Sequence, residues 1–265
     1  MRIINFKQSI VYVTHQVNDF IIDNFCNLVA QLDSTFYDVF LLYHTDHHES
    51  QHIKLSYNTG LFICNTKKIK ELGYNQICLT LLPGSINFLH QLFFLNFSTY
   101  EKYWFVEYDV LFTGNWSTLM DDCREHLPDY DFLSCHIEKY NLETNKMWPW
   151  WYNRNHVGFP YYQCVKGFNP ICRYSNRALA CLDLYMKQGF SAHSEVMITT
   201  CLYHHGMKIG DMGGRGEFVP EGWENRYYLA AEGINNGTMR YRPVYTREEI
   251  AITGRMNMLF HPLKE

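Results

Sequence analysis

Two carboxylates one residue apart, Glu107 and Asp109, interrupt an apolar stretch and are the first candidates for chemistry. Residues 103–106 before them are aromatic or β-branched, which predicts a buried strand. In an extended chain the two acids point to the same face. An unpaired buried carboxylate is costly, so such acids normally have a partner, a metal ion or an open cleft. Their place before the Thr113–Gly114 turn suits a divalent cation that carries a phosphorylated ligand; the alternative is an ion pair with Lys or Arg.

Another acid, Glu195, lies in the His193-Ser194-Glu195 stretch that precedes an apolar helix expected over 196–205. Ser194 is the expected N-cap, which places Glu195 in the first turn, where the helix dipole favours a negative charge. Capping alone explains an acid at this position. The functional interpretation is a general base at the rim of a cleft.

Residues 147–162 contain three Trp, three Tyr and two Pro, with neither a helical nor an alternating period. Trp148, Trp150, Trp151 and Tyr152 lie near the start of this segment. Flat apolar rings with polar edges suit sugar rings, so we expect a loop that stacks on a ligand. The alternative is an aromatic loop that packs on its own domain.

Three further segments give weaker signals. Residues 44–52 hold four His, but their spacing matches no standard zinc motif, and a solvated loop is the alternative. Residues 213–216 contain three Gly and would form a tight phosphate-binding turn, without the spacing of a P-loop. Residues 222–264 are rich in Arg and end in His261-Pro-Leu-Lys264; such a tail either returns over the acids to complete a diphosphate pocket or stays solvated.

The elements that must position these residues follow a β-α-β order, which predicts an α/β fold with a mostly parallel sheet and helices on its faces. We expect strands near 9–14, 39–43, 61–64, 103–106, 130–135 and 207–212, and helices near 19–32, 66–72, 86–97, 117–126, 177–188 and 196–205. Residues 167–170 are expected to form a turn or a short strand.

Composition indicates a globular protein with a substantial core, since 47% of the 265 residues are hydrophobic and 19% are charged. The net charge of −4 argues against a nucleic-acid partner. The nine Cys are odd in number and form no CxxC pair, which favours free thiols in a reducing compartment. We expect no signal peptide and no membrane span, and therefore a cytoplasmic protein.

Together these pieces resemble a GT-A fold glycosyltransferase, with a likeness in layout over about residues 9–212. That family has one α/β domain around a mostly parallel sheet, and a DxD-type acidic motif at a strand end that holds a divalent metal and a nucleotide-sugar diphosphate. Glu107-Tyr108-Asp109 is at the matching place, with Glu where the strict motif has Asp. Relatives with altered motifs use Arg and Lys in place of the metal.

Two more features carry the resemblance. Inverting members place a catalytic acid at the start of a helix beneath the acceptor, and Glu195 is similar to that arrangement. Several families bring a C-terminal His back to the metal or diphosphate, which the ending His261–Lys264 resembles. The resemblance implies a single GT-A-like domain over 1–265. In it, about 9–135 bind the nucleotide sugar, about 136–212 bind the acceptor, and an irregular C-terminal extension, 213–265, closes over the site.

The resemblance also implies roles for individual residues. Glu195 would be the general base, acting with Asp109, and the ligands of a Mn²⁺ or Mg²⁺ ion would be Asp109, Glu107 and His261. Donor contacts are expected at Thr14, His15, Tyr43, Glu107, Asp109 and Lys264. Acceptor contacts are expected at Trp148, Trp150, Trp151 and Tyr152.

The implied reaction is hexosyl transfer with inversion, by direct displacement at the anomeric carbon, from a nucleotide sugar to a carbohydrate or glycolipid acceptor, as in polysaccharide biosynthesis. Peripheral association with the inner face of the membrane is compatible with this interpretation. Two alternatives stay open at this point. One is a non-catalytic sugar- or nucleotide-binding protein of the same fold. The other is a metal-dependent phosphatase or hydrolase, although residues 109–113 do not match DxDx[TV] and neither GxSxG nor HExxH occurs.

Overall fold

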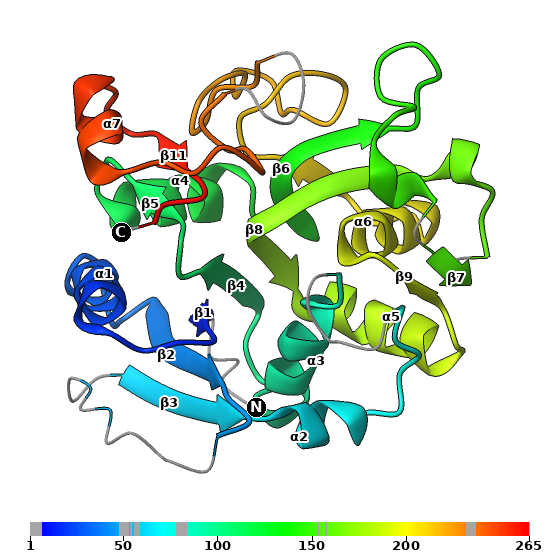
Figure 1. Cartoon of the computed structure of the whole chain (residues 1–265), viewed down its shortest axis with the longest axis horizontal. Helices are drawn as coiled ribbons and strands as arrows, with labels where there is room; N and C mark the ends of the chain where they lie inside the picture. The colour runs from blue at the N-terminus through cyan, green and yellow to red at the C-terminus, as the bar shows by residue number, and fades with distance from the viewer. Residues whose placement is uncertain are drawn as a thin grey trace.

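The core of the protein is a seven-stranded sheet (Figure 1). The computed structural model describes residues 7–47, 53, 55, 59–77, 84–152, 154–156, 158–231 and 237–264, with the backbone alone at 154–156. The strands of the sheet, in spatial order, are β10 (Ile209–Asp211), β6 (Phe132–Lys139), β8 (Val165–Ser175), β4 (Lys102–Glu107), β1 (Gln8–Thr14), β2 (Tyr37–His44) and β3 (Thr59–Cys64). β8 is antiparallel to both of its neighbours, and the other neighbouring strands pair in parallel. The expected α/β fold with a mostly parallel sheet is confirmed.

Helices cover both faces of this sheet (Figure 1). The α-helices of the described ranges are α1 (Asp19–Ala30), α2 (Thr66–Lys70), α3 (Asn87–Asn96), α4 (Trp116–His126), α5 (Asn176–Lys187), α6 (Ser194–His204) and α7 (Arg247–Ile252). Apolar side chains of α1 and α4 pack on one face with Ile10 and Tyr12 of β1, and those of α3, α5 and α6 pack on the other with Val11 and Val13. Alternate β1 side chains therefore enter opposite layers, which explains a continuous apolar run in place of an alternating one.

The strand order reverses direction at β1, which lies between β2 and β4 and is parallel to both. Val13 is level with Glu107 across the β1–β4 pair. The next residue, Tyr108, stays beside β1. Its N–H donates to the Val13 carbonyl at 3.0 Å, and its carbonyl accepts from the Tyr12 hydroxyl at 3.0 Å. In open α/β sheets, ligands bind at the carboxyl ends of the strands where the order reverses.

The C-terminal segment returns to this same point. β11 (Leu259–Phe260) pairs antiparallel with β5 (Leu111–Phe112), which directly follows the two acids. The Leu263 N–H donates to the carbonyl of Asp109 at 2.8 Å. Figure 1 shows the C-terminal end of the chain beside β5. Residues about 150 positions apart in the sequence are thus neighbours at the end of β4.

The structure differs from the sequence expectation at residues 167–170. Of the two alternatives the strand is the one observed, but it is longer than expected, because these residues lie inside β8, which is 11 residues long. Pro170 is tolerated there because the β4–β8 pairing ends at Ile171, so no β4 partner requires an N–H from the proline. The Asn-Pro pair, a common turn signal, hid this strand.

The described ranges contain eight cysteines, all of them free thiols, as expected; Cys78 lies outside the described residues. Only Cys26 among the eight is exposed. No helix in these ranges is both long enough and apolar enough to cross a bilayer.

The docking of the C-terminal segment generates a first prediction. Phe260 is fully buried against Tyr245, with ring centroids 5.3 Å apart, in a small cluster separate from the main core. We expect Phe260→Ala to cost about 3–5 kcal/mol, as for other buried Phe residues, and to loosen this segment before the sheet. Hydrogen exchange of the Leu259 and Leu263 amides measures the effect. Ile252→Ala, at a side chain 78% exposed, is the matched control. Equal loss of protection in β1 and at residue 263 would contradict local loosening.

Candidate functional site

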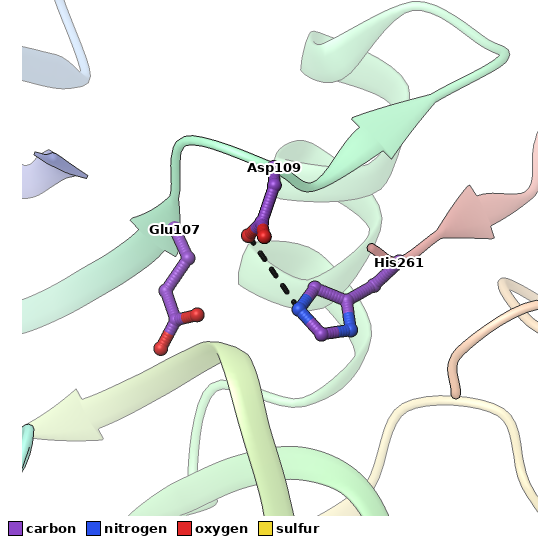
Figure 2. A group of neighbouring side chains, drawn as sticks. All are labelled: Glu107, Asp109 and His261. Carbon is purple, nitrogen blue, oxygen red and sulfur yellow. Dashed lines mark ion pairs between the residues drawn. The ribbon is translucent and has the colours of Figure 1, made fainter. Parts of the chain in front are cut away.

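Three possible metal ligands meet at the carboxyl end of β4. Glu107 is the last residue of β4, Asp109 follows it, and His261 comes directly after β11. One ligand atom from each residue lies within 4.8 Å of the others. Figure 2 shows the three side chains converging from these two parts of the chain. The structure therefore brings together the three residues for which the resemblance implied metal binding.

The orientation of His261 leaves one ring nitrogen directed at the acids. Its Nδ1 lies 2.8 Å from the carbonyl of Arg240, which accepts a hydrogen bond from it. Its Nε2 lies 3.5 Å from Asp109 Oδ1, an oxygen that has no hydrogen-bond partner. A backbone carbonyl that holds one imidazole nitrogen is the usual way to fix the other as a metal ligand.

The two acids differ in their electrostatic state. Burial and the negative charge of Asp109 raise the pKa of Glu107 to about 7. Burial also raises the pKa of Asp109, but His261 and Lys264 outweigh it and hold this pKa at about 2. Burial lowers the pKa of His261, yet Asp109 and Glu107 outweigh it and raise the pKa above 6.5. The two closely spaced carboxylates thus stabilise the positive charges of His261 and Lys264.

Lys264 supplies part of that positive charge. Its Nζ lies 2.8 Å from Asp109 Oδ2 and 2.7 Å from the hydroxyl of Tyr108. It also lies 4.6 Å from the centroid of the Tyr108 ring, which is in a T-shaped contact with the His15 ring at a centroid distance of 5.2 Å. A cation at this position suits an anionic ligand as well as Asp109.

Two cavities adjoin the acids, and Glu107 and Asp109 line both. The smaller, of 180 Å³, lies over the ends of β1 and β2 and is lined by Thr14, His15 and His44. The larger, of 210 Å³, is lined by Asn169, Glu195 and the C-terminal segment, and we name it the transfer cavity. The acid pair is thus at the boundary between two spaces.

The structure separates the residues expected on the donor side. Thr14 and His15 line the 180 Å³ cavity, as does His44. Tyr43 is buried within β2 and does not line it. Of the histidine-rich loop, Asp46 instead accepts hydrogen bonds from Thr66 at the start of α2. His48, Glu49 and His52 lie outside the described residues.

Glu195 faces the transfer cavity from the first turn of α6, as predicted for its place in the helix. The cap differs from the expectation: His193 is the N-cap, its Nδ1 accepting from the Glu195 N–H at 3.3 Å, and Ser194 is the first helical residue. Glu195 Oε2 is buried and has no hydrogen-bond partner. Burial and the charge of Glu107 raise the pKa of Glu195 to about 8, against the charge of Lys166. A carboxyl with such a pKa is able to exchange a proton near neutral pH.

Sequence reasoning missed Asn169, which lies on β8 beside these acids. Its Oδ1 accepts a hydrogen bond from the Ser134 hydroxyl at 2.6 Å, whereas its Nδ2 is buried without a hydrogen-bond partner. Buried polar atoms without partners are uncommon and call for an explanation. Three such atoms among the described residues, on Asp109, Asn169 and Glu195, belong to residues that line the transfer cavity. The transfer cavity is therefore lined by polar residues with atoms that have no hydrogen-bond partner within the described protein.

The aromatic segment packs largely on its own domain, the alternative that the sequence left open. Trp151 is fully buried, and its Nε1–H donates to the Asn145 carbonyl at 2.8 Å, so its ring is not available for a ligand. Trp150 stacks on the His193 ring at 4.3 Å with an interplanar angle of 4°. Tyr152 is 59% exposed. Trp148 is buried but lines a third cavity.

The glycine turn expected to bind phosphate has another partner. The N–H groups of Gly213 and Gly214 donate to Asp211 Oδ1 at 3.0 and 2.8 Å. The Tyr228 hydroxyl lies 2.8 Å from each Asp211 oxygen, and the Ile137 N–H donates to Asp211 Oδ2 at 3.0 Å. A side chain at position 214 would collide with that hydroxyl, because an added Cβ would lie 2.1 Å from it. This turn therefore satisfies a buried carboxylate, and the phosphate interpretation is wrong.

Comparisons with known proteins give a loose likeness. No protein-family model and no curated protein matches the chain. Among solved structures, an active-site mutant of LgtC is 9% identical over 93% of this chain and 78% of its own, with a TM-score of 0.49. Mouse xyloside xylosyltransferase 1 in its apo form is 10% identical over 78% of this chain and 85% of its own, with a TM-score of 0.41. S. aureus TarS 1–349 in complex with UDP-GlcNAc is 14% identical over 86% of this chain and 59% of its own, with a TM-score of 0.45. All three TM-scores are below 0.5, so none assigns a function to this chain.

The raised pKa of Glu195 generates a prediction about stability. Because the folded-state pKa of about 8 exceeds the ordinary 4.5, the folded protein holds this proton more tightly than the unfolded chain does. Ionising Glu195 therefore costs stability, and this cost grows between about pH 4.5 and pH 8. We expect Glu195→Gln to gain stability relative to the native protein as pH rises through this interval, by on the order of a few kcal/mol.

Urea unfolding at pH 5 and pH 8, in EDTA, measures this difference. Glu221→Gln, at an exposed acid outside the site, is the control and should show no pH-dependent change. If Glu195→Gln changes the free energy of unfolding equally at both pH values, burial does not raise the pKa of the Glu195 carboxyl.

Proposed function

We propose that this protein is a GT-A type glycosyltransferase, which moves a hexose from a nucleotide sugar to a carbohydrate or glycolipid acceptor. One observation carries the proposal: the two acids of an acid–acid–histidine cluster line two cavities, and Glu195, whose Oε2 is buried without a hydrogen-bond partner, lines one of them. Transfer between two substrates needs two adjoining spaces, a group that neutralises a leaving anion and a base for the attacking hydroxyl. The site has a candidate for each.

The residues of the cluster fit a divalent cation. Carboxylate oxygens from Glu107 and Asp109 suit Mg²⁺ and Mn²⁺, and the imidazole of His261 favours the transition metal, so Mn²⁺ is the first choice. The unpartnered Oδ1 of Asp109 and the fixed Nε2 of His261 support this assignment. When bound, the ion would neutralise charge on a leaving diphosphate. Lys264 adds a second positive group next to it.

The donor is proposed to bind across the acid pair. Its nucleoside would occupy the 180 Å³ cavity with Thr14 and His15, and its sugar would extend into the transfer cavity. Asn169 would pair with a hydroxyl there. A hydroxyl both donates and accepts, so it satisfies the free arm of this amide in either orientation.

The chemical step is proposed as a direct displacement. The acceptor oxygen would form a bond to the anomeric carbon as the bond from that carbon to the diphosphate oxygen breaks. Glu195 would take the proton of the acceptor hydroxyl, and the diphosphate would leave toward Lys264 and the acid pair. Attack from the side opposite to the leaving group inverts the anomeric centre. The raised pKa of Glu195 suits a group that must hold a proton after the step.

Ligand-induced stabilisation tests the binding half of the proposal. We expect one of UDP-, GDP-, CMP- or dTDP-sugars to raise the melting temperature in the presence of Mn²⁺, because a ligand at 100 times its Kd adds about 2.7 kcal/mol. His261→Ala and Asp109→Asn should remove the Mn²⁺-dependent part. Asp129→Asn, at a surface acid paired with Lys208, is the control. A shift that is equal with and without metal would transfer the diphosphate role to Lys264 and its neighbours.

Turnover tests the catalytic half. General-base catalysis is worth about 10²–10⁴-fold, so we expect Glu195→Gln to lower the rate of transfer by that factor. The stabilisation by donor and Mn²⁺ should be unchanged, because Glu195 is not among the proposed ligands. Transfer within tenfold of the native rate would exclude Glu195 as the base.

A further inference from the structure

A third cavity is larger than either of the two at the acid pair. It measures 610 Å³, within the range usual for small-molecule sites, against 210 Å³ for the transfer cavity. We name it the distal cavity. Its walls include His136 and Glu138 of β6, Lys166 of β8, and Trp148.

Residues of β8 line both the distal cavity and the transfer cavity. The centroid of the Phe168 ring, which lines the transfer cavity, lies 5.2 Å from that of His261, which lines the same cavity. It lies 6.0 Å from that of His136, which lines the distal cavity. Lys166 lines the distal cavity, and it is near enough to Glu195 for its charge to oppose the burial that raises the pKa of that residue. The two cavities are therefore neighbours.

Polar groups on the distal wall are held in fixed positions. Lys166 is almost fully buried, and its Nζ lies 3.2 Å from Glu138 Oε1. The Asn145 amide donates to Glu138 Oε2 at 3.0 Å and to the Lys139 carbonyl at 2.9 Å. Groups that neighbours already orient are the ones that give a pocket its specificity.

Trp148 adds an aromatic surface with an unsatisfied donor. It is 7% exposed, and its Nε1 is buried without a hydrogen-bond partner. Its ring lies 5.7 Å from Lys166 Nζ and 4.9 Å from the ring of Trp151, edge to face. An aromatic ring beside fixed polar groups suits a molecule with an apolar face and hydroxyl edges.

The charges on this wall are already paired. Lys166 pairs with Glu138, and Arg215, at the edge of the cavity, lies 3.5 Å from Glu224. Each of these two cations already has a carboxylate partner. The wall therefore favours a neutral, hydroxyl-rich ligand over a phosphate or a nucleotide.

We propose that the distal cavity binds the non-reacting sugar units of a neutral oligosaccharide acceptor whose terminal unit reacts in the transfer cavity. The inference rests on the proposed glycosyltransferase function. It narrows the acceptor from carbohydrates in general to glycans of at least two units, with Glu138, Trp148 and Lys166 as their contacts.

Binding as a function of glycan length tests the inference. The probes are methyl glycosides of one to four units in the gluco, galacto and manno series, titrated by calorimetry against the full chain with UDP and Mn²⁺. In at least one series, the Kd should fall tenfold or more between one and three units. A disaccharide that carries a uronic acid should bind less tightly than its neutral counterpart. Binding that is independent of length, tighter for the uronic acid or absent in all series overturns the proposal.

Variants locate the binding in this cavity. Trp148→Phe keeps an aromatic ring in contact with Trp151 but removes the Nε1–H, and should weaken trisaccharide binding by about threefold to tenfold. Glu138→Gln should also weaken it, because a neutral amide no longer balances Lys166. Neither should alter monosaccharide binding, and Glu221→Gln, outside the cavity, should alter nothing. Unchanged trisaccharide binding in both cavity variants overturns the assignment.

The two proposals fail in different ways. A nucleotide-dependent thermal shift without length-dependent glycan binding would overturn the distal-cavity inference and leave the proposed function intact. Length-dependent glycan binding that the cavity variants abolish, without any nucleotide effect, would overturn the transferase and leave a glycan-binding site.

Discussion

The structure depends on the cost of holding two carboxylates together at the buried end of β4. Glu107 and Asp109 repel each other there, and little solvent is present to screen them. The compensating groups, His261 and Lys264, come from the far end of the described chain. The β5–β11 pair and the Leu263–Asp109 hydrogen bond hold them in place. The C-terminal segment is thus part of the electrostatics of the site as much as part of its cover.

The same constraint extends to the residues around the two acids. Tyr108 lies between the His15 ring and Lys264, and its N–H is tied to the carbonyl of Val13. Each bond fixes the short turn between the two acids. Because these groups are already held in place, little free energy is needed to reorganise them when charge develops in the site. The unpartnered atoms of Asn169 and Glu195 are the exception, and they lie where a substrate would provide the missing partners.

Local patterns predicted much of this arrangement. The aromatic and β-branched run before Glu107 predicted β4, and α1 lies within the range 19–32 where a helix was expected. Long-range features were beyond local patterns. Nothing near residue 261 indicates that it lies beside residue 109, and only the family resemblance suggested it. The Asn169-Pro170 pair left a turn and a short strand open, because what decides between them, the end of the β4 pairing at Ile171, is a property of a neighbouring strand. Burial of Trp151 likewise depends on the packing of Tyr140 and Trp148 around it.

The spacing of Lys166 and Asn169 along β8 bears on specificity. Lys166 and Asn169 are three residues apart on one extended strand, so their backbones are separated by roughly 10 Å at about 3.3 Å per residue. Under the proposed assignment, this strand sets the spacing between the reacting sugar and the next units of the acceptor. Side-chain substitutions would change which glycan is preferred without changing that spacing. An insertion or deletion within 165–169 would do more, because a shift of one residue exchanges the two faces of a strand and would move the amide and the ammonium out of their cavities together.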